Sequence, residues 1–89
     1  MYEITRIEIL SPTTFLWDVR APEIARAARP GQFVIVRCNE TAERIPLTIA
    51  DFDSGAGTVT IVIQAAGKST FEMMDYKAGD RISDIAGPL

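Results

Sequence analysis

Three side chains that suit a flat, charged ligand lie close together near the middle of the chain. Arg44, Pro46 and Thr48 belong to one stretch, Arg-Ile-Pro-Leu-Thr-Ile-Ala-Asp, that reads as a β-strand. Proline donates no ladder hydrogen bond and is disfavoured in central strands, so the stretch predicts a strand with one side unpaired. Such an edge offers a guanidinium, a hydroxyl and backbone groups to a ligand. The alternative is an edge strand whose proline only prevents aggregation.

A second candidate is the stretch Gly67–Thr70, with the sequence Gly-Lys-Ser-Thr. A glycine followed by hydroxyl residues at a helix start leaves backbone N–H groups free at the positive end of the helix dipole, which suits a pyrophosphate. Lys68 adds positive charge. A nucleotide-hydrolysing P-loop is excluded, because that motif needs a glycine where this sequence has Val62, in a predicted strand. The alternative is an ordinary capped helix.

The composition excludes most side-chain catalysis. The chain has no histidine, which removes the usual general base and the usual zinc ligand. Cys38 is its only cysteine, so an internal disulfide and a multi-cysteine metal site are excluded, and a lone buried cysteine more often serves as a small apolar residue. We therefore predict no catalytic residues and no metal ligands. If the domain takes part in catalysis, a cofactor must carry the chemistry.

Length and charge indicate the class of protein. With 89 residues, 47% of them hydrophobic, one globular domain spanning residues 1–89 is expected. A net charge of −3 argues against a nucleic-acid partner, since phosphate binding needs a basic face. No apolar stretch approaches the length of a membrane span, and the start shows no signal peptide. The expected location is cytoplasmic, without a membrane partner.

Residue patterns predict the elements that position the two candidate stretches. A short helix is predicted over 71–76, with a hydroxyl residue available as N-cap, and one helical turn over 23–28. The segment 33–36 is a near-continuous apolar run, which indicates a strand buried on both faces or set in a closed barrel. Short connections favour antiparallel pairing, and the fold class is all-β: a six-stranded antiparallel Greek-key barrel with one short helix. Its strands are predicted over 2–10, 14–21, 32–38, 44–51, 58–66 and 81–86.

Taken in order, these segments resemble the flavin-binding barrel of the ferredoxin-NADP⁺ reductase superfamily, a riboflavin-synthase-like fold. Within it they are most similar to the electron-transfer subunit of dihydroorotate dehydrogenase and to subunit α of NADH-dependent ferredoxin:NADP⁺ oxidoreductase. The resemblance covers nearly the whole chain. It is carried by Arg29–Val34, Arg44–Asp51, Gly67–Thr70, Gly79-Asp80 and Ala86–Leu89.

The resemblance implies a flavin, FAD or possibly FMN, held by the strand that begins near Arg44. Arg44 would meet the phosphates. Pro46, Leu47 and Thr48 would face the isoalloxazine ring, with the Thr48 hydroxyl near its reactive nitrogen. In the family the arginine commonly occupies the slot that Ile45 fills here, so Arg44 would reach the phosphates only if the backbone bulges.

The same resemblance implies a second contact segment after the next strand. The residues expected to lie under the flavin are Gln64, Ala65 and Ala66. The backbone amides expected to receive the pyrophosphate are those of Gly67, Lys68, Ser69 and Thr70. Both segments must therefore border one cleft, with Thr48 and the Gly67 amide on the same side of the molecule.

The implied function is electron transfer between NAD(P)H and an iron–sulfur partner. Family members continue past the closing Gly-Pro-Leu into an NAD(P)-binding domain, which is absent from this chain. We therefore expect a domain of a longer chain, inactive with NAD(P)H by itself and partnered by that second domain and by an iron–sulfur protein or subunit. The alternative function is a non-catalytic barrel that serves as an interaction or assembly module.

Overall fold

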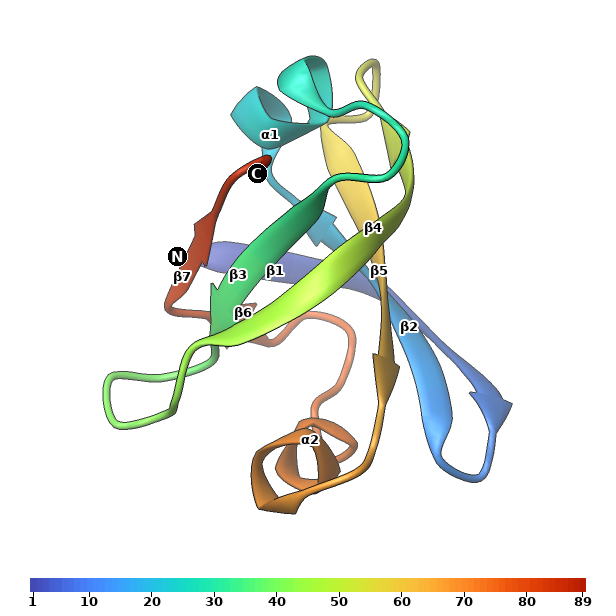
Figure 1. The fold of residues 1–89 in the computed structure, drawn as a ribbon, viewed down its shortest axis with the longest axis vertical. Helices are drawn as coiled ribbons and strands as arrows, with labels where there is room; N and C mark the ends of the chain where they lie inside the picture. Colours follow the sequence, from blue (N-terminus) through green and yellow to red (C-terminus); the bar gives the residue numbers. More distant parts are fainter.

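The structure is a computed structural model that describes all residues from 1 to 89. Two short helices connect strands: α1 (Pro22–Ala27) lies between β2 and β3, and α2 (Lys68–Met73) lies between β5 and β6. Figure 1 shows them at opposite ends of the molecule. The strands are β1 (Tyr2–Ser11), β2 (Thr14–Arg20), β3 (Phe33–Arg37), β4 (Ile45–Asp53), β5 (Thr58–Gln64), β6 (Arg81–Ile82) and β7 (Asp84–Ala86).

All strand pairs are antiparallel, and the strands form one sheet in the order β6-β1-β2-β5-β4-β3-β7. The strands β3, β4 and β5 follow one another as hairpins, and β2 lies beside β5 after a longer connection through α1. This arrangement is a Greek key. Because β6 and β7 are consecutive in the chain but terminate opposite ends of the sheet, the link between them brings the two edges together into a nearly closed barrel (Figure 1).

The predicted all-β Greek-key barrel is confirmed, with one difference in its last strand. The sequence predicts a single strand over 81–86, whereas the structure divides it into β6, paired with β1, and β7, paired with β3. The division falls at Ser83, whose N–H donates to the carbonyl of Cys38 at 3.2 Å. The physical reason is closure: the chain must leave one edge of the sheet to pair with the other.

The helices also differ from the prediction in number and position. The fold class predicted one short helix, and the structure has a second, α1, which begins at Pro22 and corresponds to the helical turn expected over 23–28. The later helix, α2, begins at Lys68, three residues before the predicted start, and its N-cap is Gly67 rather than a hydroxyl residue. The Thr70 hydroxyl stabilises this earlier start from inside the first turn.

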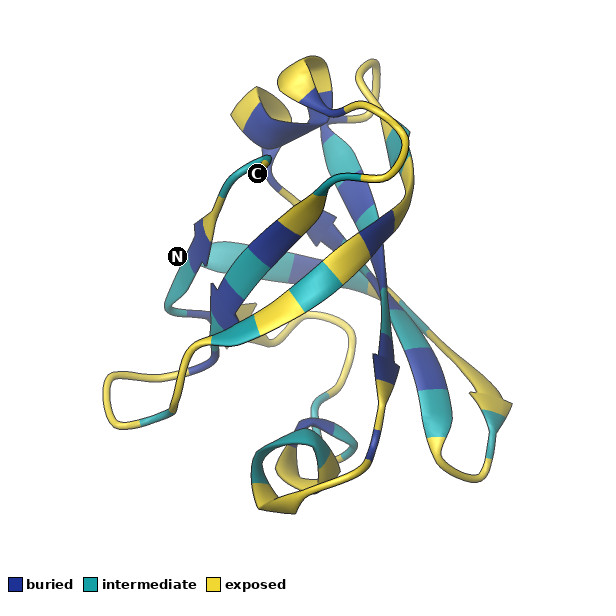
Figure 2. Ribbon diagram, in the orientation of Figure 1, coloured by how far each residue is buried: buried dark blue, intermediate teal, exposed yellow.

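The core is formed by alternating residues of the strands, as the pattern of buried positions in Figure 2 shows. In β2 the buried residues are Phe15, Trp17 and Val19, and β5 alternates in the same way. On β3 only Val34 and Val36 are buried, so this apolar run has one inner face, as a closed barrel requires, and is not covered on both sides. No polar or charged residue is buried, so any binding chemistry must take place at the surface.

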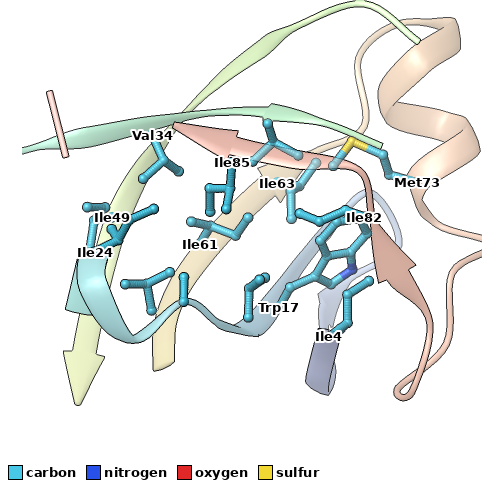
Figure 3. Close-up of a cluster of buried hydrophobic side chains, with 14 of the residues drawn as sticks. Ile4, Trp17, Ile24, Val34, Ile49, Ile61, Ile63, Met73, Ile82 and Ile85 are labelled. Atoms are coloured by element: carbon cyan, nitrogen blue, oxygen red, sulfur yellow. The ribbon is translucent and has the colours of Figure 1, made fainter. Parts of the chain in front are cut away.

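Trp17 lies at the centre of one half of this core, among Ile4, Met73 and Ile82 (Figure 3). Its ring centroid lies 5.5 Å from that of Tyr76, just beyond α2, which ties the α2 end of the molecule to the barrel. Both helices are only six residues long, and neither is able to cross a membrane.

Candidate functional site

The first four residues of β4 are paired on one side only. Ile45 to Thr48 pair with β3, opposite Val36 to Phe33, whereas pairing with β5 begins only at Ile49. The end of β5 pairs with β2 instead, where Gln64 lies opposite Thr14. The predicted one-sided strand is therefore present, and its free edge runs along Ile45–Thr48.

Pro46 lies at a position of this strand where no N–H group is needed for pairing with β3. Ile49 donates its N–H to the carbonyl of Gln32, toward the β3 side. Backbone groups alternate sides along a strand, so Ile45 and Leu47 share that direction and Pro46 faces the free edge. Proline is therefore tolerated here without the loss of a ladder hydrogen bond, and the edge stays open.

A shallow cleft of about 380 Å³ lies between this free edge and the start of α2. We call it the β4–α2 cleft. The strand side is formed by Glu43, Arg44, Ile45 and Pro46, and the opposite side by Ala66, Gly67, Ser69 and Thr70. Two stretches about twenty residues apart, each identified as a candidate for ligand binding, thus border one cavity.

On the α2 side of the cleft, some backbone amides are hydrogen-bonded within the chain and others are not. The Thr70 hydroxyl accepts hydrogen bonds from the N–H groups of Ala66 at 2.9 Å and Gly67 at 3.0 Å, which fixes the turn that leads into α2. The first intrahelical bond runs from Phe71 to the carbonyl of Gly67 at 2.9 Å. The N–H groups of residues 68–70 therefore donate no hydrogen bond within the chain, as expected for a first helical turn.

Two polar contacts connect the strand side of the cleft to its surroundings. Arg44 Nη1 lies 3.2 Å from the Asp84 carboxylate of β7, and both side chains are partly exposed. The Ser69 hydroxyl donates to the Glu43 carboxylate, which links α2 to the segment before β4. Arg44 precedes β4, so strand alternation does not fix its direction. The register shift in this strand lies elsewhere, between Ile49 and Asp51.

The other predicted site residues lie outside the cleft. Thr48 is exposed on the same outer face of β4 as Pro46, while Leu47 points to the opposite face and packs against the core. Gln64 and Ala65 adjoin the β1–β2 hairpin, where the Ala65 N–H donates to the Thr13 carbonyl at 2.7 Å. The exposed Lys68 side chain reaches toward Glu72, 4.0 Å away.

Two residues of the site were not predicted from the sequence. Glu43 borders the cleft, and its position directly before Arg44 was the only available signal. Asp84 is forty residues from Arg44 in the sequence, and the pairing of β7 with β3 brings the two together. No local sequence pattern predicts the contact between Asp84 and Arg44.

The buried Cys38 and the half-buried Tyr76 form a pair beside α2. Burial raises the pKa of the Cys38 thiol; a hydrogen bond with Tyr76 opposes this rise, and the negative charge of Glu72 adds to it. Burial likewise raises the pKa of the Tyr76 hydroxyl, with a further contribution from Cys38. Both groups are therefore neutral near pH 7, and Cys38 lacks the character of a nucleophile.

We expect Cys38 to react slowly with iodoacetamide in the folded chain. Its raised pKa lowers the thiolate fraction, so the midpoint of the rate against pH should lie above the value of about 8.5 found for a free thiol. A raised folded-state pKa stabilises the fold below the unfolded pKa, and this stability is lost as the pH rises through the folded pKa. The denatured chain is the reference, and equal labelling rates in both states would contradict the assignment.

No protein-family model matches the sequence. Over 89 residues the chain is 47% identical to a Clostridium beijerinckii protein named "Uncharacterized protein in adh 3'region", covering 100% of this chain and 30% of that protein. It is 40% identical over 86 residues to a Thermotoga maritima protein, covering 97% of this chain and 30% of the relative. That relative is named as a homologue of the electron transfer subunit of dihydroorotate dehydrogenase B (NAD⁺).

Among the solved structures that match, one covers nearly the whole barrel. It is that of an NADH-dependent reduced ferredoxin-NADP oxidoreductase, described in connection with flavin-based electron bifurcation. The TM-score is 0.95 at 39% identity, and the match covers 99% of this chain and 32% of the solved one. The chain therefore spans about a third of the length of the relatives that it matches.

Proposed function

We propose that this chain, a β-barrel of the ferredoxin-NADP⁺ reductase superfamily, is the flavin-binding domain of an electron-transfer oxidoreductase. The observation that supports the proposal is the β4–α2 cleft. It lies between the free edge of β4, which contains Pro46, and a turn whose amides donate no hydrogen bond within the chain. We propose FAD as the cofactor, with FMN as the alternative.

The residues present in the cleft fit a flavin nucleotide chemically. A diphosphate needs cationic and N–H donors, and the cleft offers Arg44 on one side and the first amides of α2 on the other. Because α2 has only six residues, direct hydrogen bonds from these amides matter more than its small dipole. A flat ring system needs an exposed edge free of protruding side chains, and Pro46 and Thr48 lie on the outer face of such an edge.

In this proposal Arg44 and the amides of Lys68, Ser69 and Thr70 hold the diphosphate, while the outer face at Pro46 and Thr48 positions the ring. Leu47 lies on the inner face, so it would meet the ring through its backbone only. A bound flavin supplies the capacity to accept and pass on electrons. The chain itself binds and orients the cofactor, because it has no histidine or buried charged group to move protons.

We infer that the electron donor and acceptor bind in the part of the relatives that this chain does not match. The Thermotoga maritima relative is named for electron transfer and NAD⁺, and the solved relative for NADH, ferredoxin and NADP. We propose that the barrel works beside an NAD(P)-binding domain of a longer chain and passes electrons between NAD(P)H and an iron–sulfur partner.

Thermal unfolding with FAD tests the binding step directly. A ligand of the native state at a hundred times its dissociation constant stabilises it by about 2.7 kcal/mol. For a domain of this size we expect the melting temperature to rise by about 10 °C or more. Riboflavin, which lacks phosphate, should give a much smaller rise at the same concentration. No shift with FAD or FMN would support the interaction-module alternative instead.

A further inference from the structure

The second half of β1 has a free edge. On the side away from β2, the two-residue strand β6 pairs only with the start of β1. The last backbone hydrogen bonds on that side are made by Ile4, with Gly79 at 2.7 Å and Asp80 at 2.8 Å. Residues 5–11 pair with β2 alone, and in Figure 1 this hairpin projects from the barrel. We call residues 5–9 the β1 edge.

The β1 edge lacks the usual protection against pairing with another chain. Exposed edge strands are commonly protected by lysine, by proline or by a covering segment. Residues 5–11 contain neither lysine nor proline, and the side chains of Ile9 and Leu10 are 61% and 49% exposed. Register irregularities lie before and after the stretch Arg6–Ile9, which itself forms an uninterrupted ladder with β2. The edge is therefore able to accept one more antiparallel strand.

The charges on the β1 edge fit a second copy of the same edge. Arg6 and Glu8 lie on one face of β1, with Arg6 Nη1 2.7 Å from the Glu8 carboxylate. When two identical strands pair antiparallel, the same backbone groups face the partner in both copies, so the two-fold axis passes through a residue. An axis through Arg6 or Glu8 places like charges opposite each other, and one through Ile9 runs into the irregularity that follows. An axis through Ile7 places Arg6 opposite Glu8 of the second copy, twice.

We propose that the β1 edge pairs with the β1 edge of a second copy of this chain, in antiparallel register about Ile7. This proposal does not depend on the proposed flavin function. Ile9 then lies opposite Thr5 of the second copy, so part of its exposed apolar surface is covered. The ladder ends at Ile4, whose backbone is already bonded, and at the irregularity after Ile9. Because each copy contributes only residues 5–9, we expect a weak dimer that forms at high concentration.

Sedimentation equilibrium with two charge variants tests both the dimer and its register. Arg6→Glu places carboxylates opposite each other across the two-fold axis, and Glu8→Arg places guanidinium groups opposite each other. Each variant should weaken dimerisation by about tenfold or more at low salt. An equimolar mixture of the two variants has opposite charges at both positions again, so it should form a heterodimer about as stable as the unmodified dimer.

The matched controls make the same charge changes on another exposed segment. Arg26→Glu and Glu23→Arg alter exposed side chains of α1, which does not adjoin β1 in the sheet. Each should leave dimerisation within about twofold, because charges beyond a Debye length are largely screened. Circular dichroism establishes that every variant is folded before its oligomeric state is compared.

Two further measurements do not depend on the ion pairs. Ile9→Lys introduces a lysine at the exposed edge and should weaken dimerisation by about tenfold or more. In the unmodified chain, amides of residues 5–9 that face away from β2 should exchange hydrogen more slowly at high concentration than at low concentration. A chain that stays monomeric at about 1 mM would overturn the proposal. So would a mixture of Arg6→Glu and Glu8→Arg that dimerises no better than either variant alone.

Discussion

Replacing Trp17 with alanine is expected to remove most of the stability of the barrel. The Trp17 side chain is fully buried between Ile7 of β1 and Ile61 of β5 in the sheet register. Truncation of a buried tryptophan costs about 3–5 kcal/mol. A domain of this length has a total free energy of unfolding of roughly 4–13 kcal/mol. The melting temperature should therefore fall by about 15 °C or more.

Trp17→Phe should be much milder than Trp17→Ala. The indole Nε1 of Trp17 is buried without a hydrogen-bond partner, and an unsatisfied buried donor costs about 1–3 kcal/mol. Both variants remove that donor, but phenylalanine keeps an aromatic ring in the core and leaves a much smaller cavity than alanine. Urea unfolding is followed by circular dichroism, because the chain contains no other tryptophan for fluorescence.

The control for both variants is Phe71→Ala, a truncation on α2 where the aromatic side chain is half exposed. It should change the free energy of unfolding by no more than about 0.5 kcal/mol. If Trp17→Ala were as mild as Phe71→Ala, the core would not be organised around Trp17. A Trp17→Phe variant as unstable as Trp17→Ala would show that the retained aromatic ring does not restore the packing of the core.

The strands of the barrel could be predicted because a buried face imposes a period of two on the sequence. Phe15, Trp17 and Val19 occupy every second position of β2, and each is buried. Proline at position 46 likewise indicates an unpaired edge through a local physical rule, the lack of a backbone donor. Features governed by such short-range rules could therefore be predicted from the sequence alone.

Features that depend on closure of the barrel could not be predicted from the sequence in the same way. The division of the last strand at Ser83 follows from the need to join two sheet edges, and nothing in the sequence near Ser83 marks it. The start of α2 was misplaced because the Thr70 hydroxyl bonds backward to Gly67 instead of capping from outside the helix. The cavity between the β3–β4 connection and α2 combines a loop with a helix about thirty residues later, so it cannot be predicted without the fold.

Removing the Arg44 guanidinium is expected to produce the largest loss of flavin affinity. Arg44 is the one arginine that borders the β4–α2 cleft, and a hydrogen bond to a charged group contributes about 1.5–3 kcal/mol. Arg44→Ala should therefore weaken FAD binding by about ten- to a hundredfold. Arg20→Ala makes the same charge change at the end of β2, on a residue that does not border the cleft, and should have an effect of no more than about twofold at physiological salt.

Asp84→Asn should have the opposite effect and strengthen FAD binding. The Asp84 carboxylate lies 3.2 Å from Arg44 Nη1 and competes with a phosphate for the guanidinium. Because this ion pair is exposed and weak, we expect a gain of only about two- to fivefold. If Asp84 acts through Arg44, the gain should disappear in the double variant, whose non-additivity measures the coupling. A gain that persists without Arg44 would instead indicate direct repulsion between Asp84 and the diphosphate.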